Sequence, residues 1–286
     1  MNKEQFDKIV LANLIHFNKG QEGWYWNHYK KEYATYKHII YLPERCKKDK
    51  IVFRHEQENV VIESCLVTPA KEAPFLLRGH LHPNAHHLNS SQVMCYNFFR
   101  PLISNKENPT RKLFEIFQSV CQKLEYDENA IVKFEYIERG ENTNFDFILH
   151  TKSIKIYCEI KYTEPDFGKK CQSKRDNHFQ NQYADMVDKC SHLWKREVDK
   201  NDFMNKYFQL FRNVIRARTD NDYVFFICPQ DRDDLKKSFD SFKNTYLKEG
   251  VDNVQFITWE SLIEKAKSIG VDVAEFEDRY FSYKKL

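Results

Sequence analysis

Alternation of apolar and polar residues marks residues 145–162 as two strands of a hairpin. The segment reads FDFILHTKSIKIYCEIKY. Successive side chains of a strand point to opposite faces, so the second half carries isoleucines and a cysteine on one face, and lysines, a tyrosine and Glu159 on the other. A tight turn around residues 150–153 lets the two strands pair, which predicts that Asp146 lies across from Glu159 and Lys161.

Two carboxylates and an ammonium at one end of a hairpin have the composition of a site that hydrolyses phosphodiesters. Asp146 and Glu159 offer the oxygen ligands that Mg²⁺ prefers, and Lys161 offers a positive charge near an attacking water or the developing phosphorane. The alternative is an ordinary wet hairpin face with cross-strand ion pairs. A D…ExK pattern arises by chance in a chain with 30% charged residues, so the surrounding elements have to decide.

The residues around the hairpin predict a defined order of helices and strands. Apolar residues at helical spacing indicate a helix over 108–124, followed by a strand over 131–138 and a turn over 140–144. Beyond the hairpin the pattern predicts helices over 179–194 and 203–218, a buried strand over 223–228, a helix over 235–247, a strand over 254–259 and C-terminal helices. The order is helix, three strands, helices, strand, helix, strand.

This order, with Asp146 on the second strand and an ExK run on the third, resembles the core of the PD-(D/E)XK nuclease superfamily over residues 85–265. Asn144 and Phe145 stand where the motif name has a proline, which is often missing. Three segments are similar to a family of proposed restriction endonucleases within that superfamily: 88–102 (LNSSQVMCYNFFRPL), 159–169 (EIKYTEPDFGK) and 207–213 (YFQLFRN). The resemblance implies an α/β fold with a restriction-endonuclease-like core, in the order αβββαβ, whose central mixed sheet is flanked by helices.

The resemblance also implies roles for particular residues. Asp146, Glu159 and Lys161 would be catalytic, with Asp146 and Glu159 as ligands of Mg²⁺, for which Mn²⁺ substitutes. The backbone carbonyl of Ile160 and the side chain of Glu115 would be further metal ligands. The implied activity is metal-dependent hydrolysis of double-stranded DNA in restriction or phage defence.

Three other functions share this fold and stay open: a protein that binds nucleic acid without cutting it, a repair or structure-specific nuclease, and an RNA nuclease. The presence of Asp146, Glu159 and Lys161 together favours cutting over binding alone, because a degenerate member is expected to have lost one of them.

Basic residues follow the ExK strand directly and are candidates for contacts with the phosphate backbone. They are Lys169, Lys170, Lys174 and Arg175. Gln182, on the helix that comes next, is a candidate for contact with phosphate or a metal-bound water. The alternatives are a solvated loop and an ordinary helix-edge amide.

The chain is expected to divide into an N-terminal, α-rich extension over residues 1–84 and a nuclease core with C-terminal helices over 85–286. An amphipathic helix is predicted from Phe6 to Leu14. The aromatic, lysine-containing segment 24–36 would pack on the core, contact DNA or join a second subunit. A homodimer is expected, because one metal site cuts one strand and a two-fold pair of sites cuts both.

Four histidines between His80 and His87 can be drawn as a zinc site, but a surface loop near the substrate channel is the favoured interpretation. The residues just after them, NSSQ, are typical of the cap of a helix that begins near Gln92.

Composition favours a cytoplasmic protein without a membrane segment. No apolar run approaches the length of a membrane span, and the N-terminus is polar, without a signal-peptide pattern. The eight cysteines are scattered without a CxxC pair, which predicts reduced, mostly buried thiols.

Overall fold

The computed structural model describes residues 1–17, 26–27, 32–33, 89–103, 108–137, 143–168 and 175–285. Of the aromatic segment 24–36 it describes two short antiparallel strands, β1 (Trp26–Asn27) and β2 (Glu32–Tyr33). The histidines between His80 and His87, most of the predicted turn over 140–144, and Lys169, Lys170 and Lys174 lie outside the described residues.

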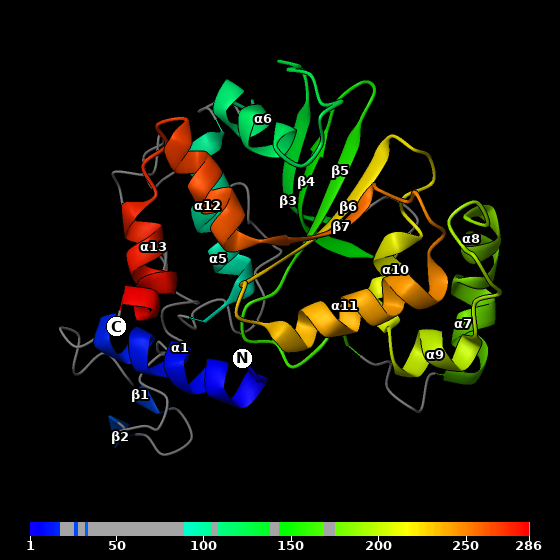
Figure 1. Ribbon diagram of the computed structural model, residues 1–286, viewed down its shortest axis with the longest axis horizontal. Helices are drawn as coiled ribbons and strands as arrows, with labels where there is room; N and C mark the ends of the chain where they lie inside the picture. The colour runs from blue at the N-terminus through cyan, green and yellow to red at the C-terminus, as the bar shows by residue number, and fades with distance from the viewer. Residues whose placement is uncertain are drawn as a thin grey trace.

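A five-stranded mixed sheet lies at the centre of the described fold (Figure 1). Its order is β3 (Ile131–Ile137), β4 (Asn144–His150), β5 (Lys155–Ile160), β6 (Asp222–Cys228) and β7 (Val254–Thr258). The pairs β3–β4 and β4–β5 are antiparallel, whereas β5–β6 and β6–β7 are parallel. The predicted hairpin is confirmed, and its turn is closed by a hydrogen bond from the Thr151 N–H to the Ile154 carbonyl, 2.8 Å long.

Helices cover both faces of the sheet. One face packs against α1 (Lys3–Phe17), α5 (Ser91–Phe99), α6 (Arg111–Gln118), α12 (Trp259–Ser268) and α13 (Ala274–Phe281). The other packs against α7 (Arg175–Gln182), α8 (Ala184–Lys189), α9 (Lys200–Asn205), α10 (Phe208–Val214) and α11 (Asp233–Tyr246). Short 3₁₀ helices follow α5 (Arg100–Leu102) and α13 (Ser282–Lys285). The described fold is therefore a three-layer α/β structure.

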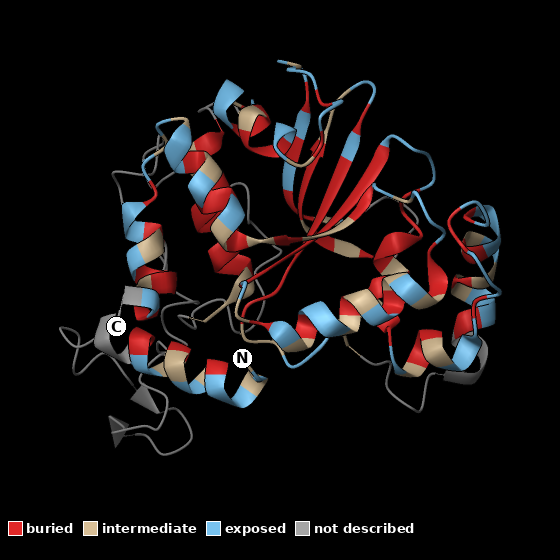
Figure 2. Ribbon diagram, in the orientation of Figure 1, coloured by how far each residue is buried: buried red, intermediate tan, exposed pale blue. Residues whose placement is uncertain are grey.

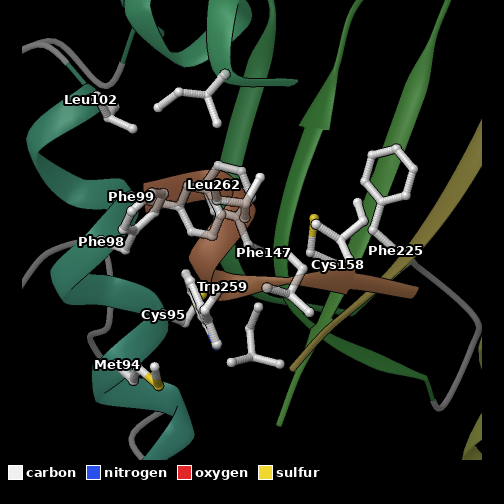
Figure 3. Close-up of a cluster of buried hydrophobic side chains, with 14 of the residues drawn as sticks. Met94, Cys95, Phe98, Phe99, Leu102, Phe147, Cys158, Phe225, Trp259 and Leu262 are labelled. Carbon is white, nitrogen blue, oxygen red and sulfur yellow. The ribbon is translucent and has the colours of Figure 1, made fainter. Parts of the chain in front are cut away.

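Burial follows the layers: the strands are buried along most of their length, and the helices turn buried stripes toward them (Figure 2). We call the buried side chains between the sheet and α1, α5, α6, α12 and α13 the first core cluster, and those on the opposite face the second. Aromatic rings dominate the first cluster, where Phe99 of α5 stacks on Phe147 of β4 with ring centres 4.3 Å apart. Figure 3 shows this cluster, with Cys95, Cys158 and Trp259 beside the stacked rings. A stacked aromatic pair contributes about 0.5–1.5 kcal/mol beyond the area it buries. This packing holds α5 against the sheet.

The predicted N-terminal helix is confirmed, and it packs against α13. The Asn13 side chain donates a hydrogen bond to the Arg279 carbonyl, 2.8 Å long. The predicted cap is also confirmed: the Ser90 hydroxyl accepts a hydrogen bond from the Val93 N–H at the start of α5. Figure 1 shows α1 and α13 side by side.

Three helix predictions were too long. The helix predicted over 108–124 is α6, which ends at Gln118, where the chain turns and the Gln118 side chain binds the Leu124 carbonyl. The helix predicted over 179–194 is interrupted at Tyr183, and the helix predicted over 203–218 is interrupted at Lys206 and Tyr207. Apolar spacing persists across each break because the residues on both sides of it face one core cluster, which is the first cluster at the end of α6 and the second at the other two breaks.

The described cysteines are free and buried, as predicted: Cys95, Cys121, Cys158, Cys190 and Cys228. None of the helices in the described ranges is long and apolar enough to cross a bilayer.

Candidate active site

Glu135 and Asp146 lie opposite each other at an interruption in the ladder between β3 and β4. The regular cross-strand pairs on either side are Phe134 with Phe147 and Tyr136 with Phe145. The first pair belongs to the first core cluster and the second packs in the other, so both strands change the face they present at this position. Glu135 has φ +49°, the one positive φ of a non-glycine residue in the described ranges. A residue with positive φ increases the local twist of its strand. The two acidic side chains lie at this twisted interruption between β3 and β4.

Asp146 also marks the point where β4 separates from β5. The last regular pair of this ladder is Phe147 with Cys158. Continued by one residue, the register sets Asp146 opposite Glu159, as the sequence predicted. The Asp146 carboxylate accepts a hydrogen bond from the Ile160 N–H, 2.6 Å long, in the place of a backbone acceptor. The Asp146 carbonyl lies 3.6 Å from the Cys95 sulfur.

Both carboxylate oxygens of Glu159 are held by donors. Oε1 lies 3.1 Å from Lys161 Nζ and accepts a hydrogen bond from Gln209 Nε2 at 3.2 Å. Oε2 accepts one from Asn213 Nδ2 at 3.0 Å. Glu159 and Lys161 are each only 5% exposed. An ordinary wet hairpin face would leave both in solvent, so burial argues against that alternative.

Burial, and then mutual repulsion, disfavour the charged forms of Asp146 and Glu135. Burial, and then the neighbouring charges of Glu159 and Glu135, raise the pKa of Asp146 well above its usual value. Burial likewise raises the pKa of Glu135, against the opposing effect of hydrogen bonds from Gln92 and Asn144. A divalent cation would relieve this repulsion.

Lys161 balances part of this negative charge. Burial alone would lower the pKa of the ammonium, but the carboxylates of Glu159, Glu164 and Asp146 outweigh burial and raise it. Lys161 is therefore a fixed positive charge beside Glu159 at neutral pH.

Asp146 and Glu159 could hold a divalent cation that takes the rest of its ligands from water. In the described part of the chain, no three His, Cys, Asp or Glu side chains form a metal-binding group. Mg²⁺ keeps several waters and takes one or two carboxylates, which Asp146 and Glu159 would supply. Zinc and calcium sites, by contrast, draw most of their ligands from the protein.

Glu115 forms no group of three metal-binding side chains with Asp146 and Glu159 in the described part of the chain. Glu115 is half-buried on α6, whose buried residues pack in the first core cluster. Glu159 instead points toward α10, which packs in the second cluster on the other face of the sheet. On the first face, α5 reaches Glu135 through Gln92 and Asp146 through Cys95. The role of Glu115 as a metal ligand stays a prediction.

The other predicted residues have varied placements. Ile160 has a buried side chain, and its N–H donates to Asp146, while the metal-binding role of its carbonyl stays a prediction. Arg175 is the first residue of α7, and Gln182 is half-buried at the end of that helix. The contacts predicted for Lys169, Lys170 and Lys174 concern residues outside the described ranges.

Three site residues escaped the sequence analysis. Gln209 and Asn213 have a signal in hindsight, because two amides four residues apart on an otherwise apolar helical stripe lie on one face of α10. Glu135 has none, since its burial and its φ depend on the pairing of β3 with β4.

A mixed sheet flanked by helices, with a half-buried Asp and a buried Glu and Lys where its strands separate, is compatible with the restriction-endonuclease-like class of proteins. A family described as "Restriction Endonuclease associating with ARP" matches residues 26–281, and the chain belongs to this family. Comparison with curated proteins and with solved structures found no match.

Proposed function

We propose that the chain is a metal-dependent endonuclease that hydrolyses phosphodiester bonds of double-stranded DNA, in restriction or phage defence. The observation that carries this proposal is the group of half-buried Asp146 with buried Glu159 and Lys161 where β4 leaves β5. Membership of a restriction endonuclease family supports it.

Asp146 and Glu159 would hold the divalent cation, and the Ile160 carbonyl remains a candidate third protein ligand. The cation, when bound, neutralises phosphate charge and lowers the pKa of a coordinated water. Gln209 and Asn213 keep Glu159 in one orientation, so little reorganisation is needed when substrate arrives.

Lys161 would act on the phosphate or on the attacking water. Its ammonium is buried and lies beside Glu159. A positive charge in an enclosed site stabilises negative charge that develops on a phosphoryl group far more than the same charge in water does. Binding without cutting would not require this lysine to be enclosed next to a metal-binding carboxylate.

The test is cleavage by the purified chain with Mg²⁺ or Mn²⁺ on methylated and unmethylated duplex DNA, single-stranded DNA and RNA. We expect metal-dependent cutting of duplex DNA. Asp146→Asn and Glu159→Gln should abolish it and weaken metal binding, because an amide does not replace the lost charge. Asp188→Asn and Glu249→Gln, at exposed positions, are the matched controls and should cut normally. Near-normal cutting by Asp146→Asn would show the assignment to be wrong, and cutting of RNA alone would favour the RNA nuclease.

A further inference from the structure

Gln209 joins the loop that leaves β5 to the Glu159 carboxylate. Its side-chain Nε2 donates to Glu159 Oε1. Its backbone N–H donates to the Phe167 carbonyl, and that bond is 2.9 Å long. Residues 162–168, which directly follow Lys161, thus contact the residue that holds Glu159.

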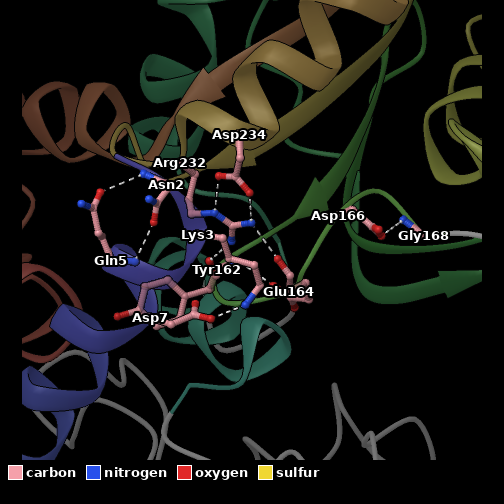
Figure 4. Close-up of polar contacts among 10 residues, drawn as sticks. All are labelled: Asn2, Lys3, Gln5, Asp7, Tyr162, Glu164, Asp166, Gly168, Arg232 and Asp234. Atoms are coloured by element: carbon pink, nitrogen blue, oxygen red, sulfur yellow. Dashed lines mark hydrogen bonds and ion pairs between the residues drawn. The ribbon is translucent and has the colours of Figure 1, made fainter.

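Gly168 leaves room for the Gln209 side chain. A Cβ at this position would lie 3.3 Å from both Cγ and Cδ of Gln209, closer than ordinary van der Waals contact. The backbone of Gly168 has φ +75°, and its N–H donates to the Asp166 carboxylate at 2.7 Å (Figure 4). An alanine here would therefore strain the turn and press on Gln209.

The other end of the loop is anchored by a buried arginine. Arg232 is fully buried and donates to the carbonyls of Tyr162 and Glu164, at 2.7 and 2.8 Å. Its guanidinium also makes two bonds of 2.8 Å to the Asp234 carboxylate (Figure 4). Planar, paired bonds of this kind fix direction as well as distance. Arg232 thus holds the start of the loop at Tyr162 and Glu164. At its other end the loop contacts Gln209 through the Phe167 carbonyl.

We propose that Gln209 is a positioning residue that transmits the position of loop 162–168 to Glu159 and so sets the affinity of the site for its divalent cation. This inference rests on the proposed function. Glu159 Oε1 is shared between Gln209 and Lys161. Without the Gln209 amide, Asn213 still holds Oε2, but Oε1 keeps only Lys161 and can shift toward the ammonium, away from the geometry that a cation needs. Loss of a group that orients a metal ligand typically costs about 10–100-fold in metal affinity or activity.

The experiment measures Mn²⁺ affinity by calorimetry on the full chain without DNA, together with thermal unfolding. Gln209→Met keeps much of the side-chain volume and removes the donor, so affinity should fall about 10–100-fold while the fold persists. Gly168→Ala should lower affinity as well, because the new Cβ displaces Gln209. Added to Gln209→Ala, Gly168→Ala should lower affinity little further, since the side chain it would displace is gone.

Gly250→Ala is the matched control. Gly250 has φ +81°, and a Cβ there meets no atom within 4 Å. This variant carries the same kind of backbone strain, so its Tm should fall while its Mn²⁺ affinity stays at the wild-type value. Wild-type affinity in Gln209→Met, or fully additive losses in the double variant, would overturn the inference while wild-type cleavage upholds the proposed function. A wild-type chain that neither binds Mn²⁺ nor cuts DNA overturns both.

Discussion

At the scale of single residues, chemistry is concentrated in one enclosed group. Glu159 and Lys161 are buried against each other, and Asp146 closes the group by binding the Ile160 N–H. Burial makes each charge in the group costly unless it is paired. The same burial strengthens the electrostatic effect of these charges on a phosphate.

Lys161→Ala should lower the cleavage rate by orders of magnitude with little change in DNA affinity. The reason is that Lys161 is proposed to act mainly in the transition state, and loss of such an interaction reduces the chemical step and not ground-state binding. Single-turnover rates and equilibrium DNA binding separate the two effects, with Lys189→Ala at an exposed position as the control. Much weaker binding with a normal single-turnover rate would reassign Lys161 to phosphate binding.

His150 should make the protein less stable as the solution becomes acidic. Burial, and then the charges of Lys155 and Lys133, lower the pKa of His150 from 6.5 to about 4. Its Nε2 is buried without a hydrogen-bond partner in the described ranges, and its ring packs on Tyr136 and Tyr157. Because the folded pKa is below the unfolded one, the unfolded chain binds the proton first. The contribution of neutral His150 to the free energy of unfolding is fully present above about pH 6.5. It is lost as pH falls toward 4, by at most about 3 kcal/mol.

The measurement is the free energy of unfolding between pH 7 and 4, for wild type and His150→Gln. The difference between the two curves isolates the imidazole from the carboxyl groups that titrate in the same range. A difference that stays constant with pH would contradict the assignment.

At the scale of elements, the site depends on where strands and helices stop. The sheet opens between β4 and β5 because the ladder ends at Phe147 and Cys158. The interruption at Tyr207 starts α10 afresh, and this helix sends Gln209 and Asn213 to Glu159. An uninterrupted helix over 203–218 would not necessarily turn these two amides toward the sheet.

The basic segment after β5 should contact phosphates without reading sequence. Replacing Lys169, Lys170, Lys174 and Arg175 by alanine should weaken DNA binding to a similar extent for all sequences. It should also flatten the dependence of log affinity on log salt by about one unit per lost contact. Titrations at several salt concentrations test this, with the exposed Lys189 and Lys237 as a control pair. An unchanged slope in the fourfold variant would return the segment to an ordinary solvated loop.

At the scale of the whole molecule, the prediction concerns assembly. Each chain has one proposed cutting site, and a two-fold pair of sites would cut both strands of a duplex in one encounter. We therefore expect a homodimer on DNA, measurable by sedimentation, and double-strand breaks as the product. A monomer both with and without DNA, with single-strand nicks as the only product, would contradict the homodimer and indicate a nickase or repair-type nuclease.

The local pattern of the chain was sufficient for several features. Period-two alternation identified β4 and β5 and their register, and with it the meeting of Asp146, Glu159 and Lys161. Such features are local: a two-residue period and a short turn leave few ways to pair two neighbouring strands. The buried run at β6 and the cap at Ser90 were recognised for the same reason.

Tertiary structure decided the rest. Glu135 joins Asp146 and Glu159 only because β3 pairs with β4 and because the backbone of Glu135 itself has φ +49°. Gln209 and Asn213 reach Glu159 only because α10 packs on the second face of the sheet, and Gln92 and Cys95 reach Glu135 and Asp146 because α5 packs on the first. These contacts join segments about 10 to 50 residues apart in the chain, and no local propensity specifies which face a helix covers. The sequence by itself determined which residues carry the chemistry on one hairpin, and the packing of layers determined which residues support them.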